Sequence, residues 1–199
     1  MSKPTSATDP RPGRRRSWTR HVRRLVRSDD GVALIGFGFT LPLLVAISFG
    51  ILEFTLLMFE FHRATEATRR GARLAAISAP VTDISALGAG ASVTCTLTAG
   101  AVSCSNGAAT STAAFDNVLK HMQAIFPAVA GENLHITYSN SGIGDADTPG
   151  GILPMVTIDL VDLRHDFMVL QAIPGSISSI TLPRFTTNYL AGGQGPSTS

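Results

Sequence analysis

The sequence predicts an α+β protein: one N-terminal transmembrane helix, extended beyond the membrane, and a small domain after it. The first observation is an apolar run, Val32–Phe59, whose 28 residues include one charged residue, Glu53. About 20 apolar residues rising about 1.5 Å each cross the hydrocarbon core of a bilayer, so the run is long enough to span once. The second observation is that short runs rich in β-branched residues follow it, together with one amphipathic helical segment, in a length that suits one small domain.

The spanning segment is expected to be helical, because its backbone must satisfy its own hydrogen bonds in lipid. The helix is expected to continue through Phe61–Ser78, which contains strong helix formers and ends before Pro80. Glu60 and Arg63 are spaced to support this part as an ion pair. A stripe of small residues suits close packing against a sheet or another helix; its members are Ala64, Ala67, Gly71, Ala75 and Ser78.

The N-terminal tail carries most of the positive charge. Residues 1–28 hold nine basic residues and one acid, a net +8, so the rest of the chain carries −6 of the total of +2. An acidic domain argues against nucleic-acid binding. Basic residues beside a span stay in the cytoplasm and attract anionic lipid, which predicts a cytoplasmic N-terminus and a periplasmic domain. The arginines concerned are Arg14, Arg15, Arg16, Arg23, Arg24 and Arg27. A cleaved secretory signal is the alternative, but the apolar run is about twice the usual length of 7–15 residues.

Two features inside the span point to helix contacts. Ala46 and Gly50 form a small-xxx-small pair that lets another helix approach closely. Glu53 falls near the outer boundary of the membrane. It is expected either to reach the interface with its carboxylate or to meet a positive group on a partner helix.

The two cysteines are predicted to form a disulfide. Val93–Ser105 has the pattern of a β-hairpin with Ala99-Gly100 as its turn. Counting back from this turn places Cys95 opposite Cys104 in a non-hydrogen-bonded pair, with Cα atoms about 4.5 Å apart. The predicted periplasmic location is oxidising, which favours the bond.

The remaining elements complete a small domain of a β-hairpin, one helix and about three further strands. One helical face and its Pro127 stop predict a helix over Phe115–Phe126. Strands are expected over 134–139, 153–163 and 177–189, the last one in two pieces if Pro183 breaks it, with a loop over 140–151 and a short helix or crossover over 167–173. The chain is thus expected to divide into a disordered cytoplasmic tail (1–28), a transmembrane helix (29–59), a periplasmic extension (60–79), an exported domain (80–190) and a flexible tail (191–199).

The sequence offers no recognisable catalytic or metal motif. There is no nucleophile elbow, phosphate loop or zinc pattern. Asp162–Asp166 contains an acid and a histidine but is interpreted as a polar turn, and His121, His135 and His165 lack ligand spacing. We therefore expect no enzyme, no cofactor, no metal and no small-molecule substrate.

Two segments carry a family resemblance. Gly50-Ile51-Leu52-Glu53-Phe54 closes the span, and Ala67–Ala76 (ATRRGARLAA) follows it. Together they resemble the TadE-like domain of the TadE, TadF and TadG pilus-assembly proteins of the bacterial tight-adherence system. The resemblance implies a membrane-anchored, pseudopilin-like structural or assembly component of a Flp, type IV-like pilus. It also implies that Phe54, Gly71 and Arg73 contact helices of other pilus subunits or inner-membrane assembly proteins.

The resemblance also implies a processing site between Gly31 and Val32. Pilin-like members carry a glutamate five residues after this glycine, and here Gly36 takes its place. The alternative function from another class is a membrane-tethered periplasmic module that binds an envelope ligand.

Overall fold

The computed structural model describes residues 29–85, 87–144, 152–172 and 175–192. The basic tail, its six named arginines and most of the predicted 140–151 loop lie outside these residues. Contacts between Cα atoms divide the chain into two compact units, with the boundary between Gly50 and Ile51.

Helix α2 (Asp29–Ile77) is a single helix with Pro42 inside it. The predicted continuation beyond the apolar run is therefore confirmed. By length and composition, α2 from Gly31 onward can cross a membrane, and its most apolar window has a mean hydropathy of 2.3. From Val32 to Gly50 every side-chain position is exposed, so the apolar surface is not the core of this chain.

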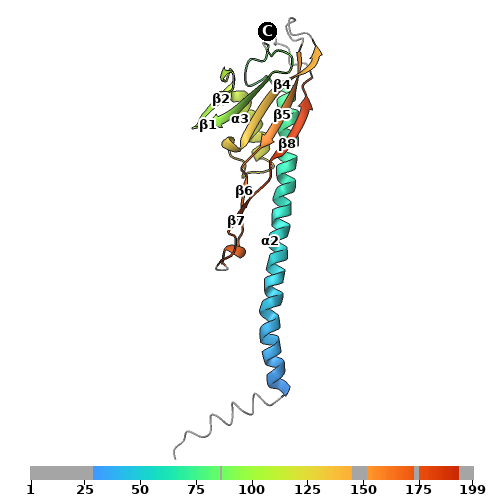
Figure 1. The fold of residues 1–199 in the computed structure, drawn as a ribbon, viewed down its shortest axis with the longest axis vertical. Coiled ribbons are helices and arrows are strands. Elements are labelled where there is room, and N and C mark those ends of the chain that lie inside the picture. Colours follow the sequence, from blue (N-terminus) through green and yellow to red (C-terminus); the bar gives the residue numbers. More distant parts are fainter. Residues whose placement is uncertain (1–28, 86, 145–151, 173–174, 193–199) are drawn as a thin grey trace, which may run out of the picture. The chain divides into compact units, whose positions relative to one another are not determined.

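The domain in the second unit is built on a six-stranded antiparallel sheet in the order β3-β2-β1-β4-β5-β8 (Figure 1). A long apolar helix followed by a mixed helix and sheet domain confirms the predicted fold class. The strands are β1 (Ser92–Thr98), β2 (Ala101–Cys104), β3 (Gly107–Ala108), β4 (Leu134–Gly144), β5 (Ile152–Leu160) and β8 (Phe185–Leu190). A 3-10 helix, η2 (Gly131–Asn133), leads into β4.

The β1–β2 hairpin has the register that the sequence predicts. Cys95 pairs with Cys104 and Thr98 with Ala101. Its turn residues, Ala99 and Gly100, have φ values of 51° and 80°. Positive φ at both central positions is the turn that matches strand twist in a two-residue hairpin.

Helix α3 (Thr112–Gln123) begins earlier and ends earlier than the predicted helix. Ser111 caps it by accepting a hydrogen bond from the Ala114 N–H, as serine commonly does. Its buried residues are Phe115, Val118 and Met122.

Strand β5 covers most of the strand expected over 153–163. Val156, Ile158 and Leu160 are fully buried on one face of β5. The strand ends at Leu160, three residues before the end of the expected strand. Asp162 instead lies in the turn after the strand with a φ of 54°.

A second, two-stranded sheet pairs β6 (Arg164–Asp166) with β7 (Ser179–Thr181). The interpretation of 162–166 as a polar turn is therefore wrong for its second half. Between the strands lies a 3-10 helix, η3 (Leu170–Ala172), inside the segment expected to be a short helix or crossover. The last predicted strand does break into two, β7 and β8. We call the described residues 164–172 and 175–181 the arm; it runs beside the part of α2 in the second unit (Figure 1).

Candidate interaction surfaces

Helix α2 carries a long run of exposed apolar side chains. The predicted contact residues Ala46, Gly50 and Phe54 are all exposed, and a Cβ built at Gly50 meets no atom within 4 Å. The exposed fractions of its large side chains reach 80% at Phe39. A surface of this kind fits lipid or a neighbouring apolar helix.

Glu53 differs from its neighbours on α2 because it is only 4% exposed. Its carboxylate accepts hydrogen bonds from the backbone N–H groups of Val169 and Leu170 in the arm, the latter at 3.2 and 3.3 Å. The chain itself therefore supplies partners for this acid. A contact between Glu53 and a neighbouring helix stays a prediction.

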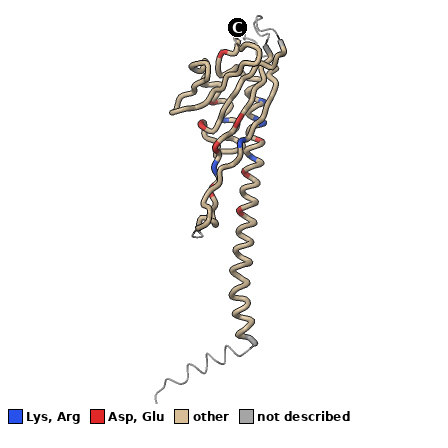
Figure 2. Tube along the Cα trace, in the orientation of Figure 1, with Lys and Arg blue, Asp and Glu red and all other residues tan. Residues whose placement is uncertain are grey.

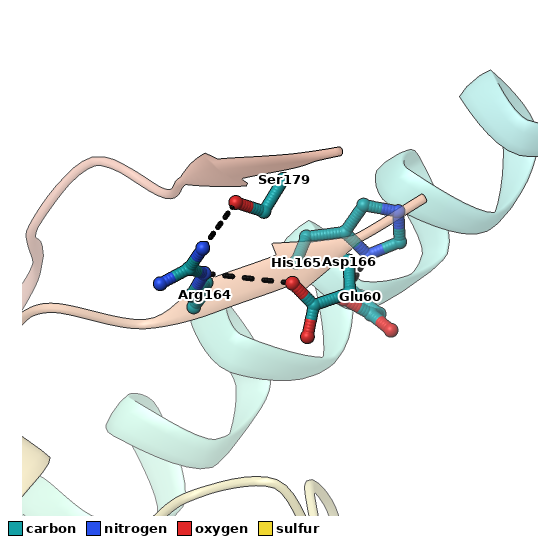
Figure 3. A network of polar contacts seen from close by, with 5 residues as sticks. All are labelled: Glu60, Arg164, His165, Asp166 and Ser179. Atoms are coloured by element: carbon teal, nitrogen blue, oxygen red, sulfur yellow. Dashed lines mark hydrogen bonds and ion pairs between the residues drawn. The ribbon is translucent and has the colours of Figure 1, made fainter. Parts of the chain in front are cut away.

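A second acid of α2 holds the arm nearer its base. The His165 Nδ1 lies 2.6 Å from the Glu60 Oε2, and the His165 side chain is 8% exposed (Figure 3). The Glu60–Arg63 pair expected from sequence does not form. Arg63 instead donates from Nε to the Ile125 carbonyl at 2.7 Å.

The outer side of β6 carries a separate, exposed contact. Arg164 donates to the Ser179 hydroxyl at 2.6 Å across the arm and lies 3.5 Å from the Asp166 carboxylate (Figure 3). This contact faces away from α2, so the arm is attached to the helix by Glu53 and Glu60. Among the described residues, no group of three or more acidic, histidine or cysteine side chains is arranged to hold a metal.

Gly71 packs inside the domain. A Cβ at this position would lie 2.5 Å from the Met122 Sδ of α3. The helix that Gly71 contacts thus belongs to its own chain. Met122 fills the space beside Gly71, and the implied contact with another subunit's helix stays a prediction.

Arg73, by contrast, lies on the open wall of a groove of about 730 Å³. Within the described residues, none of its three arginines forms an ion pair. Their positive charge would suit an acidic ligand. The lining residues are Glu66, Arg69, Arg70, Arg73, Leu74, Ile77, His121, Thr187 and Tyr189.

One segment of the chain matches a known family model. Residues 31–73 match the model of the TadE-like protein family. No curated protein and no solved structure matches the chain. The match confirms the resemblance over α2 and implicates tight-adherence pilus assembly, while the sheet and the arm lie outside it.

The TadE-like segment contains Glu53, Glu60 and Gly71, so both acids that hold the arm are inside the matched region. It begins at Gly31, and the predicted Gly31–Val32 processing site therefore lies in the first turn of α2. Processing at this bond stays a prediction.

The two cysteines are joined in the structure. Cys95 and Cys104 form a disulfide with Cα atoms 4.0 Å apart, across the β1–β2 pair. Cys95 is fully buried against the core. The bond closes the hairpin at the side of the sheet and forms no part of the surfaces above.

No sequence pattern identifies Glu60 and His165 as partners, because they are 105 residues apart. One feature of the sequence does set the arm apart, namely its lack of charged residues after Asp166. From Phe167 to Pro183 the sequence contains no Asp, Glu, Lys, Arg or His.

Proposed function

We propose that this chain is a membrane-anchored, pseudopilin-like structural or assembly component of a tight-adherence pilus. The observation that carries the proposal is the TadE-like match over α2. It is supported by the uncovered apolar surface from Val32 to Gly50, which a spanning helix presents to lipid and to other helices. The partners would be other pilus or pseudopilin subunits and inner-membrane assembly proteins.

The proposed topology is a single pass through the bacterial inner membrane. The basic tail (1–28) stays in the cytoplasm, 29–59 span, 60–79 extend the helix into the periplasm, 80–190 form the periplasmic domain and 191–199 end the chain. The Cys95–Cys104 disulfide is consistent with an oxidising compartment.

Contacts with other helices are proposed at Ala46, Gly50, Phe54 and Arg73, with Glu53 as a further contact. Gly50 can be tested directly, because it is exposed and nothing packs on it. Gly50→Leu should prevent close approach of a second helix and reduce pilus assembly in the native bacterium. Gly38→Leu is the matched control, since it adds the same side chain to an equally open helix position outside the small-xxx-small pair. Equal pilus assembly in the two variants and in the wild type would exclude the proposed contact at Gly50.

The mass of the intact protein from native membranes decides between two forms of this function. A chain that begins at Val32 would show processing after Gly31 and support a subunit that can enter the filament. A full-length chain would support a permanent anchor that acts as an assembly factor.

The alternative function is a membrane-tethered periplasmic module that binds an envelope ligand. The groove of Arg69, Arg70 and Arg73 favours it, because three basic side chains that form no ion pair with any described residue line one open space. Arg69→Gln/Arg70→Gln should then abolish ligand binding and leave pilus assembly intact. Loss of pili in this variant would instead assign the groove to an assembly partner.

A further inference from the structure

The tip of the arm carries apolar residues. Along the axis of α2, this tip lies beside Glu53, which is inside the apolar run. Glu53 holds the arm through Val169 and Leu170, and the last exposed apolar residue of the run is Phe59. Six residues of helix separate Glu53 from Phe59, which is about 9 Å along the axis at about 1.5 Å per residue. If the apolar run of α2 is in the bilayer, the tip of the arm lies below the outer edge of the run.

The side chains at this tip suit a lipid environment. Met168 is 73% exposed and Ile177 is 61% exposed. The stretch from Phe167 to Pro183 has no charged residue, and the charges of the arm stay at its base, where Arg164 and Asp166 lie (Figure 2). An uncharged tip with exposed apolar side chains is unusual in water and is typical of a segment that enters the interface of a membrane.

Several backbone groups near the tip have hydrogen-bond partners within the chain, which a low-dielectric environment favours. Glu53 accepts from the N–H groups of Val169 and Leu170. The Leu170 carbonyl accepts from the Ser176 hydroxyl, and the Met168 carbonyl accepts from the Gln171 amide at 3.4 Å. These bonds give an irregular segment its own partners where water is scarce.

We propose that the tip of the arm, carrying Met168 and Ile177, inserts into the outer interface of the membrane beside α2. Lipid is chosen over a protein partner because the arm contacts α2 at Glu53, where the neighbouring apolar side chains Leu52 and Phe54 are exposed. The arm then gives the domain a second attachment to the bilayer. This inference rests on the membrane anchoring in the proposed function.

The test places a single tryptophan at chosen positions of the full-length chain in vesicles of phosphatidylethanolamine and phosphatidylglycerol. Trp18, the one natural tryptophan, is first replaced by Phe. Met168→Trp reports on the tip, and Phe54→Trp reports on α2 one residue from Glu53. Tyr189→Trp, on β8 in the domain, is the control for exposure to water. Lipids brominated on their acyl chains quench a tryptophan that lies among them.

Strong quenching of Met168→Trp and Phe54→Trp, with little quenching of Tyr189→Trp, is the expected result. Quenching at Phe54 without quenching at Met168 would overturn the inserted arm and leave the membrane anchor standing. Quenching at neither position would overturn both. Ile177→Trp repeats the measurement on the other side of the tip, so that a local disturbance at Met168 cannot decide the outcome.

Discussion

The sheet and the arm are attached to the same helix by different chemistry. The sheet side uses small residues and close apolar contact: Ala64 and Ala67 are fully buried, and the rings of Phe61 and Phe185 meet edge to face at 4.9 Å between centroids. The arm side uses two carboxylates of α2, Glu53 and Glu60.

The two kinds of contact are expected to differ in how strongly they hold the sheet and the arm against α2. Packed apolar surfaces are stabilised in proportion to the area removed from water and transmit any change in volume. Carboxylate contacts are few and specific, so the arm can open without unfolding the sheet. We therefore expect changes in the first interface to affect the whole domain and changes in the second to affect the arm.

Gly71→Leu should have the largest effect, because it overfills the interface between α2 and α3. Its Cβ alone would lie 2.5 Å from the Met122 Sδ, and Met122 is fully buried and has little room to move. We expect the free energy of unfolding of the domain to fall by about 3 kcal/mol. Urea unfolding of the full chain in detergent measures this. Gly50→Leu is the control and should leave the domain unchanged; equal stability of the two variants would contradict close packing at Gly71.

The second largest effect is a loss of domain stability at alkaline pH. It concerns the hydrogen bond between the sheet and the segment after α2. The Tyr138 hydroxyl accepts from the Val81 N–H at 3.2 Å, and burial raises the pKa of Tyr138 to about 12. Because the folded state keeps its proton longer than the unfolded state, this stability is complete below pH 10 and is lost as pH rises towards 12. The loss should be roughly 2–3 kcal/mol.

Tyr138→Phe separates this loss from the titration of other groups. The variant should be less stable at pH 7 by about 1 kcal/mol, because the Val81 N–H loses its acceptor. Between pH 10 and 12 it should lose less stability than the wild type. Parallel curves for the two proteins over this range would show that Tyr138 is not buried in its neutral form.

Glu53→Ala should release the arm and spare the sheet. It removes the acceptor of two backbone N–H groups, those of Val169 and Leu170, and a lost buried hydrogen bond of this kind costs about 1–3 kcal/mol. Hydrogen exchange of these two amides should speed up, while the amides of β4 and β5 keep their protection. Glu53→Gln keeps an acceptor oxygen and should show a smaller change. Unchanged exchange at Val169 and Leu170 in Glu53→Ala would mean that the carboxylate does not hold the arm.

The sequence predicts best those features that depend on neighbours along the chain. The β1–β2 register follows from one turn, and α3 follows from the spacing of Phe115, Val118 and Met122. The attachment of the arm was not predictable in the same way. Glu53 stands out in the sequence as a costly acid in an apolar run, but its partners are backbone N–H groups more than 100 residues away, which no side-chain pattern identifies.

Substitutions in the pair of Glu60 and His165 should have the smallest effect on the attachment of the arm. They test how the base of the arm is held to α2. The Glu60 side chain is 33% exposed, so solvent screens the contact, and a pair of this kind contributes about 0.5–1 kcal/mol. A double-mutant cycle with Glu60→Gln and His165→Asn measures the coupling through exchange of the arm amides, and Asn keeps a donor near the position of Nδ1. A coupling of this size that falls in 1 M salt would show an ion pair, since the screening length there is about 3 Å. Zero coupling would leave Glu53 as the one acid of α2 that fastens the arm.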